Sequence, residues 1–560
     1  MQKMKRIALA AIAVLCMAPL TALADDAFKP SNASASQTLF ATALVFISGV
    51  IFLIVCALLF VRIARPAAEE DVQAWPTLVL VVALALALRV LAATMFEGYS
   101  SDIACFKGWA IAAYENGPAG FYDPNMFADY PPGYMGVLWL LGFIRSAFQI
   151  DAGGALFTLL IKLPAILAEV GLALLAYRIA SRRQDKTFGL LCAAFLLFNP
   201  AMFFDSSVWG QIEPVLTLFL ALALWFLYEK RYIAAAALYA LAVIFKPQAI
   251  MFAPVIGLAY LYGAIQWAVK QEKKRNAILL LCGTLVALPP VVLLIVGALS
   301  QGGVQLGALT AWSDAVWTAY GSLGMLWRIL IGAGLAAVSL TLMGLGAGIR
   351  RLAYGLGCVL AAAAVLALFI GPFTGDQSAF WIIKKYTGTI DYYSYASINA
   401  FNVYTLLGLN WGAIPTFALF GAEIAWGTAA LVFICMGIVV LQWRTRAQRR
   451  FFDLAALLVI SVFMLVHSMH ERYILPACIC LVFAYIESRD ASTLFFAAAF
   501  SIYALLNQML TLYAPTVTAP ETPTVVLSAV GVALYGVYAV LSVRKLWSNK
   551  VLIKTPAMQG

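Results

Sequence analysis

The chain has few charged residues and almost no histidine. Only 11% of its 560 residues are Asp, Glu, Lys or Arg, and it has two histidines, His467 and His470. Soluble domains carry about 25% charged residues, so this composition argues against a soluble protein. Instead, 64% of the residues are hydrophobic, and apolar runs long enough to cross a bilayer recur along the chain. The sequence predicts an all-α polytopic membrane protein.

The cysteines are wrongly placed to indicate a disulfide-stabilised fold, and the histidines are too few to indicate a zinc site. Most of the nine cysteines lie inside apolar runs, and Cys105 lies in a polar loop. A zinc site normally needs three or four ligands, and no cysteine or third histidine lies near His467 and His470. The segment "HSMHE" also differs from H-E-x-x-H, whose glutamate stands between the histidines. We therefore expect no cofactor and do not favour a divalent metal.

The N-terminus reads "MQKMKRIALAAIAVLCMAPLTALADDAF". Its basic start, apolar stretch and Ala-Leu-Ala before Asp25 predict a signal peptide at residues 1–24. The alternative is an uncleaved first helix. Either version places residues 25–37 outside.

Apolar runs separated by polar connectors predict about 13–15 transmembrane helices. They lie near residues 38–62, 76–96, 153–179, 187–204, 211–228, 231–246, 248–264, 277–299, 326–348, 353–371, 413–441, 452–468, 472–487, 491–509 and 522–545.

Alternation from an outer start places most basic residues in the inner loops, as the positive-inside rule requires. The net charge of +10 is thereby explained by the lipid bilayer, and no nucleic-acid partner is expected. The basic residues concerned are Arg62, Arg65, Arg182, Arg183, Lys186, Lys230, Arg231, Lys270, Lys273, Lys274, Arg275, Arg350 and Arg351, with the runs 444–450 and 544–550.

The predicted outer loops hold the polar, aromatic and acidic residues, so we expect the working site on that face. These loops are 97–152, 205–214, 246–248, 372–412 and "HSMHER". Residues 132–148 are apolar but short, and a crossing there would place "RRQDK" outside. We therefore predict a helix lying along the outer surface at 132–148.

Asp102 lies just after the predicted helix 76–96, with Lys107 one to two turns along. A carboxylate at the bilayer edge suits a general base, and the lysine suits substrate binding. The alternative is that Ser101 or Asp102 only caps the helix that follows.

Asp129 and Tyr130 precede two prolines, Pro131 and Pro132, in the same loop. The prolines stiffen the loop and can aim Asp129 inward. Alternatively, Pro132 only starts the surface helix.

The turn "DSSVWGQIEP" adds further candidates for binding a hydroxyl-rich ligand through its amide and carboxylates, although tryptophan at this depth is also a common interface anchor. The candidates are Asp205, Trp209, Gln211 and Glu213.

Lys246 stands between apolar stretches in "VIFKPQAIMF", where a charge is costly unless it is paired or functional, and Gln248 is close enough to share a ligand.

Asn399 and Asn402 belong to a tyrosine-rich loop typical of a sugar or lipid-headgroup surface. That loop could equally only cover the helix ends.

His470 and Arg472 project where a lipid phosphate would lie, and arginine binds phosphate oxygens through two nitrogens. Glu471 could orient the arginine or contact a sugar hydroxyl, while His467 could be only packing.

An ordered set of segments resembles the membrane-embedded GT-C glycosyltransferases that use polyprenyl-phosphate sugars, most of all bacterial relatives of glycosylphosphatidylinositol mannosyltransferase II. Dolichyl-phosphate-glucose glucosyltransferases show similar patterns. The segments span residues 76–490 and read "SDIACFKGWA", "YPPGYM", "FNPAMFFDSSVWGQIEP", "FKPQA", "SINAFNVYTLLG" and "MHERYILP".

The resemblance implies a GT-C fold with outer juxtamembrane helices, Asp102 as the catalytic carboxylate, and a donor phosphate near the "HER" segment. Because a lipid phosphate leaves as an anion, it needs cations, and the candidates are Lys246, His470 and Arg472. The resemblance also implies transfer of a hexose, with mannose favoured over glucose, to an envelope glycan or lipid-linked acceptor outside a bacterial plasma membrane. The extra N-terminal helix and an insertion at about 300–350 depart from the family pattern.

The chain therefore divides into the signal peptide, an extra segment 25–75 with one transmembrane helix, a catalytic module 76–490, and C-terminal helices with a basic cytoplasmic tail at 491–560.

Two alternative functions stay open. One is a transporter or flippase for a lipid-linked sugar that uses Lys162, Glu169 and Glu423, which together with Arg89 could instead be structural partners. The other is a glycan polymerase or ligase with a lipid-pyrophosphate donor.

Overall fold

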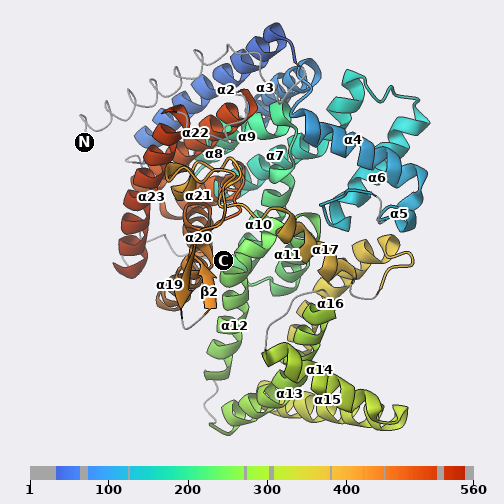
Figure 1. Ribbon diagram of the computed structural model, residues 1–560. Coiled ribbons are helices and arrows are strands. Elements are labelled where there is room, and N and C mark those ends of the chain that lie inside the picture. The colour runs from blue at the N-terminus through green and yellow to red at the C-terminus, as the bar shows by residue number, and fades with distance from the viewer. Residues whose placement is uncertain are drawn as a thin grey trace.

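The structure, a computed structural model, describes residues 33–63, 74–123, 126–269, 274–301, 308–378, 381–419, 422–446, 448–513 and 522–548. The predicted signal peptide and the last part of the basic tail lie outside the described residues. Helices make up almost all of what is described (Figure 1).

The first half of the chain alternates long apolar helices with short ones at their ends. Its helices are α2 (Ala35–Arg62), α3 (Ala74–Met95), α4 (Ser100–Glu115), α5 (Gly117–Gly120), α6 (Pro132–Ala147), α7 (Ala155–Arg183), α8 (Lys186–Leu197), α9 (Pro200–Phe203), η2 (Phe204–Trp209), α10 (Glu213–Tyr228), α11 (Tyr232–Phe245), η3 (Pro247–Phe252) and α12 (Ala253–Val269).

The second half contains the remaining helices and the strand pair. They are α13 (Lys274–Gln301), α14 (Ala308–Ser322), α15 (Met325–Ala347), α16 (Ile349–Ile370), η4 (Gly371–Phe373), α17 (Trp381–Tyr392), α18 (Val403–Leu406), β1 (Thr416–Leu419), β2 (Ala422–Ala425), α19 (Trp426–Arg444), α20 (Phe451–Leu465), α21 (Leu475–Ser488), α22 (Ala491–Tyr513) and α23 (Thr522–Ser548).

The polytopic character predicted from the composition is confirmed. Among the described residues, nine helices are long and apolar enough to cross a membrane, and a bent pair, Lys186–Leu197 with Pro200–Trp209, gives a tenth. Five shorter apolar helices account for the difference from the predicted 13–15. The predicted surface helix at 132–148 corresponds to α6.

Two predicted spans differ from the structure. The span 413–441 begins only at Trp426, because Thr416–Leu419 and Ala422–Ala425 pair as an antiparallel hairpin instead. The span 187–204 is bent by 42° after Leu197. There the Asn199 side chain caps the next turn by accepting from the backbone N–H groups of Ala201 and Met202, and Pro200 occupies its first position.

The core lies among α7, α8, α10, α20, α21 and α22, where most side chains are buried. Buried charges in this core are paired. Arg89 of α3 forms an ion pair with Glu169 of α7, and both side chains are almost fully buried. This confirms that Arg89 and Glu169 are structural partners.

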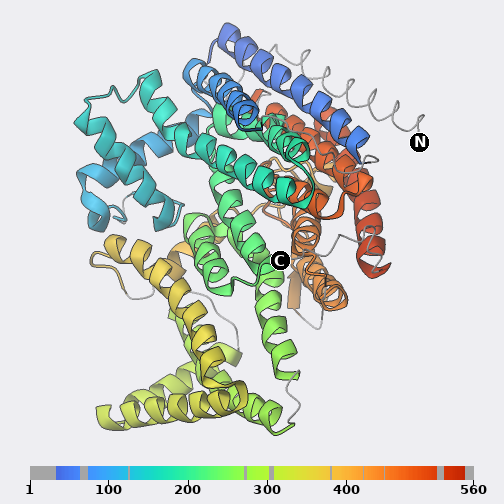
Figure 2. The same ribbon diagram turned by 180° about the vertical axis from the view of Figure 1, so that it is seen from behind.

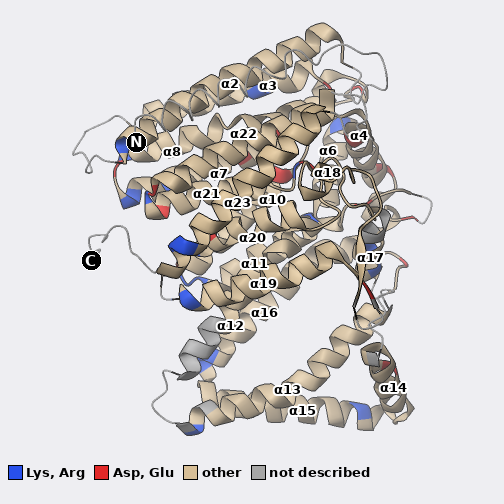
Figure 3. Ribbon diagram, turned by 60° about the vertical axis from the view of Figure 1, so that its left-hand side comes forward, with Lys and Arg blue, Asp and Glu red and all other residues tan. Residues whose placement is uncertain are grey.

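Many lysines and arginines gather at one end of the helix bundle, which we call the basic end (Figure 3). Ion pairs join its helices there, such as Arg62 with Asp185 at 2.6 Å and Lys545 with Asp453 at 3.2 Å. The opposite end, where residues 96–102, 209–213 and 466–474 meet, is called the site end.

Helices α13, α14 and α15 form an arm beside the bundle (Figure 2). The close approach of α13 and α15 requires glycine at position 346, because a Cβ there would lie 2.7 Å from the carbonyl oxygen of Asn276. Of residues 300–350, the insertion expected from the sequence, helices α14 and α15 lie in this arm. Most of its large apolar side chains are exposed, as expected of helices that face lipid.

Candidate active site

Asp102 lies in the first turn of α4, at the site end. The helix begins at Ser100 with Tyr99 as its N-cap residue, and no side chain caps it. The capping role considered for Ser101 or Asp102 is therefore not observed. A carboxylate in the first turn is instead favoured by the partial positive charge of the helix N-terminus.

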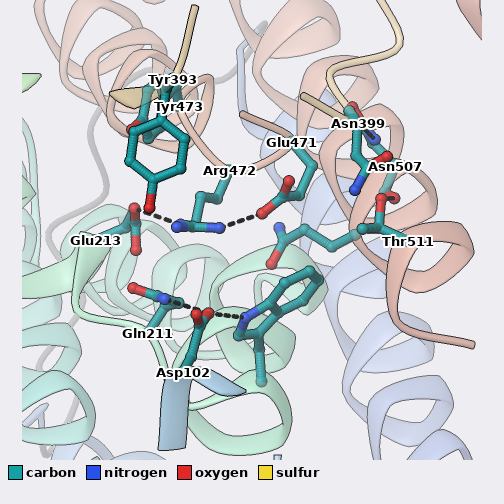
Figure 4. A network of polar contacts seen from close by, with 12 residues as sticks. Asp102, Gln211, Glu213, Tyr393, Asn399, Glu471, Arg472, Tyr473, Asn507 and Thr511 are labelled. Carbon is teal, nitrogen blue, oxygen red and sulfur yellow. Dashed lines mark hydrogen bonds and ion pairs between the residues drawn. The ribbon is translucent and has the colours of Figure 1, made fainter. Parts of the chain in front are cut away.

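One side chain from the last residue of η2 and one from just after it hold the Asp102 carboxylate (Figure 4). Trp209 Nε1 donates to Asp102 Oδ2 at 2.8 Å, and Gln211 Nε2 donates to the same oxygen at 2.5 Å. Asp102 Oδ1 accepts no hydrogen bond from the described residues. One oxygen is thus fixed by the protein, and the other is left for a ligand.

Gln211 links Asp102 to the rest of the site. Its Oε1 accepts from the hydroxyl of Tyr130 at 3.0 Å and from Nζ of Lys246 at 3.5 Å. Since both neighbours are donors, the amide oxygen must face them and the amide nitrogen must face Asp102. The orientation of Gln211 is therefore determined by its neighbours.

Two cations share the carboxylates of this cluster. Lys246 pairs with Glu213, and Arg472 lies with its Nε 3.3 Å from the same Glu213 oxygen while its Nη1 donates to Glu471. Burial lowers the pKa of Lys246, and the neighbouring Glu213 opposes that shift. Both cations lie at breaks between helices, where the chain can bring them together.

His470 is a neutral member of the site. Burial lowers the pKa of its imidazole well below the usual value, and Arg472 and Lys246 lower it further. Its ring lies between Tyr393 and Tyr473, with ring centroids at 5.0 and 4.9 Å. Positive charge in the cluster therefore comes from Lys246 and Arg472, while His470 can offer a hydrogen bond.

Asp129 lies in the loop before α6 and contacts the loop after α17. Its Oδ2 accepts from the hydroxyl of Tyr393 at 2.9 Å. Burial raises the pKa of the Asp129 carboxyl, and the hydrogen bond from Tyr393 opposes this rise. The contact joins the two long loops that the sequence places on one face.

Some carboxylate oxygens at this end are buried without a hydrogen bond to the described residues. They are both side-chain oxygens of Asp205 and the Oε2 of Glu213. Buried carboxylate oxygens are costly to leave unpaired. These oxygens can therefore accept further hydrogen bonds, such as those from hydroxyl groups.

Asn399 and Asn402 organise their own loop. The Oδ1 of Asn399 accepts from Trp411 at 2.9 Å and from Asn410 at 3.1 Å. Asn402 caps α18, and its side-chain nitrogen donates to the carbonyl of Phe463 at 3.0 Å. The side-chain oxygen of Asn399 and both polar atoms of the Asn402 side chain are thus already engaged within the protein.

Helix α22 supports that loop from behind. Asn507 donates to the carbonyl of Asn399 at 2.6 Å and accepts from the N–H of Phe401 at 3.1 Å, and the Tyr503 hydroxyl donates to the carbonyl of Phe401. Figure 4 shows Asn399 and Asn507 beside Glu471.

The remaining predicted residues lie around the cluster. Lys107 forms an ion pair with Glu97 at 3.3 Å, and Gln248 donates to the hydroxyl of Tyr473 at 2.6 Å. Trp209 is buried and stacks on Tyr99 with 4.9 Å between ring centroids. Its contact with Asp102 makes it a support for the carboxylate rather than a surface open to a sugar.

Sequence reasoning missed two tyrosines. Tyr473 follows Arg472 directly, and Tyr393 belongs to the run "DYYSY". A tyrosine beside an arginine at a helix break was the available signal for the first. The contact of Tyr393 with Asp129 joins segments far apart in the chain, so no local pattern could have indicated it.

The cluster combines a carboxylate with one free oxygen, two cations and several unpaired carboxylate oxygens, which suits a base beside an anion-binding group. Within the described part of the chain, no group of three or more His, Cys, Asp or Glu side chains is arranged to hold a metal ion.

No protein-family model matches the chain, and a search of curated proteins finds no match to it.

Proposed function

We propose that this protein is an inverting glycosyltransferase of the GT-C type, which transfers a hexose from a polyprenyl-phosphate donor to an envelope glycan or lipid-linked acceptor. Mannose is the favoured sugar, with glucose as the alternative. The observation that carries the proposal is the position of Asp102. Its carboxylate is fixed through one oxygen and lies in the same polar cluster as Arg472 and Lys246.

Asp102 is suited to act as the general base. In a direct displacement, the acceptor hydroxyl attacks the anomeric carbon, and a base must take its proton. Asp102 Oδ1 is available for that proton, while Trp209 and Gln211 hold Oδ2. Fixing the carboxylate in this way limits the motion that would otherwise separate the base from the hydroxyl.

Arg472 and Lys246 are suited to bind the donor phosphate. The lipid phosphate leaves as an anion, so cations stabilise the departing group. The Nε of Arg472 faces Glu213 and its Nη1 donates to Glu471, while its Nη2 donates no hydrogen bond to the described residues. That nitrogen remains to donate to a phosphate oxygen.

The proposed donor also explains the unpaired carboxylate oxygens. Asp205 and Glu213 retain oxygens without a partner, and sugar hydroxyls are donors that would satisfy them. The multi-pass helices supply the lipid environment in which a polyprenyl chain dissolves. With the basic end on the cytoplasmic side, the site would face the periplasm or exterior of a bacterial plasma membrane.

Reconstituted vesicles test the proposal directly. The purified protein should transfer hexose from a synthetic polyprenyl-phosphate hexose, and Asp102→Asn should abolish the transfer while leaving expression and thermal stability unchanged. Full activity of Asp102→Asn would contradict the assignment of the base. A preference for the polyprenyl-pyrophosphate donor would instead support a polymerase or ligase.

The three residues considered for a transport pathway, Lys162, Glu169 and Glu423, have other partners in the structure. Glu423 lies exposed on the β1–β2 hairpin and accepts from Thr416 at 2.8 Å, while Glu169 is paired with Arg89. Lys162 donates to backbone carbonyls. None of these contacts joins the three residues to one another.

A further inference from the structure

Lys162 is a fully buried cation with an unusual set of partners. It lies on α7, and its Nζ donates to the carbonyl oxygens of Phe96 at 2.8 Å, Ser207 at 2.9 Å and Val208 at 3.2 Å. No carboxylate of the described residues lies within 4.0 Å of it, the limit for an ion pair. The three hydrogens of the ammonium are therefore matched to three backbone acceptors.

These carbonyls belong to two helix ends. Phe96 directly follows α3, and Ser207 and Val208 lie in the last turn of η2. Carbonyl groups at helix C-termini lack partners within the helix and carry partial negative charge. The Lys162 ammonium satisfies both ends at once and joins them.

The two joined segments lead into the candidate active site. The segment after Phe96 continues to Asp102, and the segment after Val208 carries Trp209 and Gln211, which donate to the Asp102 carboxylate. The Tyr99 N–H also donates to the carbonyl of Trp209 at 3.1 Å. Lys162 thus lies directly behind the place where base and base-holding residues meet.

Two glycines allow the segments to come this close. Gly98 has φ +120°, and a Cβ there would lie 2.4 Å from the carbonyl oxygen of Trp209. Gly210 has φ +95°, and a Cβ there would lie 2.4 Å from Ile103 and 3.1 Å from Cε of Lys162. These positive φ values are ones that other residues rarely adopt.

We propose that Lys162 is a positioning residue for the transfer reaction: it fixes the Phe96–Asp102 segment against the Trp209–Gln211 turn and so sets the position of the Asp102 carboxylate. The inference rests on the proposed function for its kinetic part. Its structural part, the joining of the two segments, stands independently of the reaction.

The test substitutes Lys162→Met, which keeps the length of the side chain and removes the three donors. We expect kcat to fall by about 10- to 100-fold, because a misplaced catalytic group loses rate in that range, with KM for the polyprenyl-phosphate hexose unchanged. Amide hydrogen exchange should accelerate by about tenfold or more at residues 97–102 and 209–212, since three buried carbonyls lose their partners.

A matched control removes another buried polar link between α7 and its neighbours. In the double variant Arg89→Met with Glu169→Met, the ion pair of α3 and α7 is replaced by apolar side chains. It should keep the wild-type kcat and wild-type exchange at both segments. A loss of kcat equal to that of Lys162→Met would mean that weaker helix packing alone explains the effect, and would overturn the proposal.

Measuring both kcat and amide hydrogen exchange distinguishes failure of the positioning role from failure of the proposed function. Wild-type kcat and unchanged local exchange in Lys162→Met would overturn the positioning role. If the wild-type protein shows no transfer at all, the proposed function fails, while the exchange measurement still decides whether Lys162 joins the segments.

If Lys162→Met does not fold, a second variant, Gly98→Ala, perturbs the same junction. It should show the same acceleration of local hydrogen exchange and the same loss of kcat. Wild-type exchange and kcat in Gly98→Ala would contradict the proposal.

Discussion

Arg472 and Glu213 form an ion pair at the site end, with Arg472 Nε 3.3 Å from Oε1 of Glu213, the oxygen that also pairs with Lys246. One carboxylate oxygen therefore holds two cations side by side despite their mutual repulsion. Two adjacent cations suit an anion with several charged oxygens better than a single carboxylate. This geometry makes the pair a suitable receptor for a phosphate group.

Removing the guanidinium should weaken donor binding. We expect Arg472→Ala to raise the KM for the polyprenyl-phosphate hexose by about 10- to 100-fold, because a hydrogen bond to a charged group contributes about 1.5–3 kcal/mol. Arg472→Lys should recover only part of this, since an ammonium lacks the planar fork of arginine. Initial rates in proteoliposomes over a range of donor concentrations measure the effect, and an unaltered KM in Arg472→Ala would exclude phosphate binding by this residue.

The amide of Gln211 should not tolerate replacement by a carboxylate of the same shape. In Gln211→Glu, the nitrogen that donates to Asp102 becomes an oxygen, so two carboxylates face each other and repel. We expect kcat to fall by at least about tenfold, corresponding to loss of about 1.4 kcal/mol of transition-state stabilisation, and the acidic limb of the pH–rate profile to move to higher pH. Gln248→Glu provides the control, because Gln248 contacts Tyr473 and not Asp102. An unshifted profile in Gln211→Glu would argue against the contact.

His470 should make the protein less stable in mild acid. Its pKa lies well below the usual value in the folded protein and at about 6.5 in the unfolded chain. Below about pH 6.5 the unfolded chain therefore binds the extra proton, and the free energy of unfolding falls as the pH is lowered. His470→Gln should reduce the drop in thermal midpoint between about pH 7.5 and pH 5.5. The comparison variant is His467→Gln, whose imidazole pKa is lowered by burial alone, and equal drops in His470→Gln and wild type would refute the buried neutral imidazole.

The hydrogen bond between Tyr393 and Asp129 should stabilise the ionised carboxyl. Tyr393→Phe removes a donor that opposes the burial-induced rise in the Asp129 pKa, so that pKa should rise further. We expect a cost of roughly 1–2 kcal/mol in the free energy of unfolding, typical of a hydrogen bond to a charged group. Denaturant titration near neutral pH measures it. Because the carboxyl becomes protonated at low pH in both proteins, the difference between variant and wild type should shrink there, and a constant difference would show that ionisation is not involved.

Sequence patterns predicted the helices because hydrophobic length is a local property. Apolar runs such as 491–509 and 522–545 correspond closely to α22 and α23. The prediction of a helix over residues 413–425 was wrong, because hydrophobicity alone does not distinguish a short hairpin from a helix. Residues such as Thr416, Phe417 and Ile424 fit a strand equally well.

The candidate site was only partly predictable for the same reason. Asp102, Gln211, Glu213, Lys246 and Arg472 were recognisable as polar residues at helix breaks, and the structure brings them into one cluster. Which of them touch depends on long-range packing. The contacts of Asn399 with Asn410, of Asn402 with Phe463 and of Lys162 with three carbonyl groups join segments that no local pattern relates.

The attachment of the Asn399–Phe401 loop to α22 has a consequence for biosynthesis. Asn507 and Tyr503 lie far towards the C-terminus, yet they fix the backbone of this loop beside Glu471. A chain emerging from the ribosome therefore contains every charged residue of the cluster before it contains the helix that fixes their surroundings. The newborn protein should acquire its finished site only after α22 has entered the membrane, so synthesis itself would delay activity until the bundle is nearly complete.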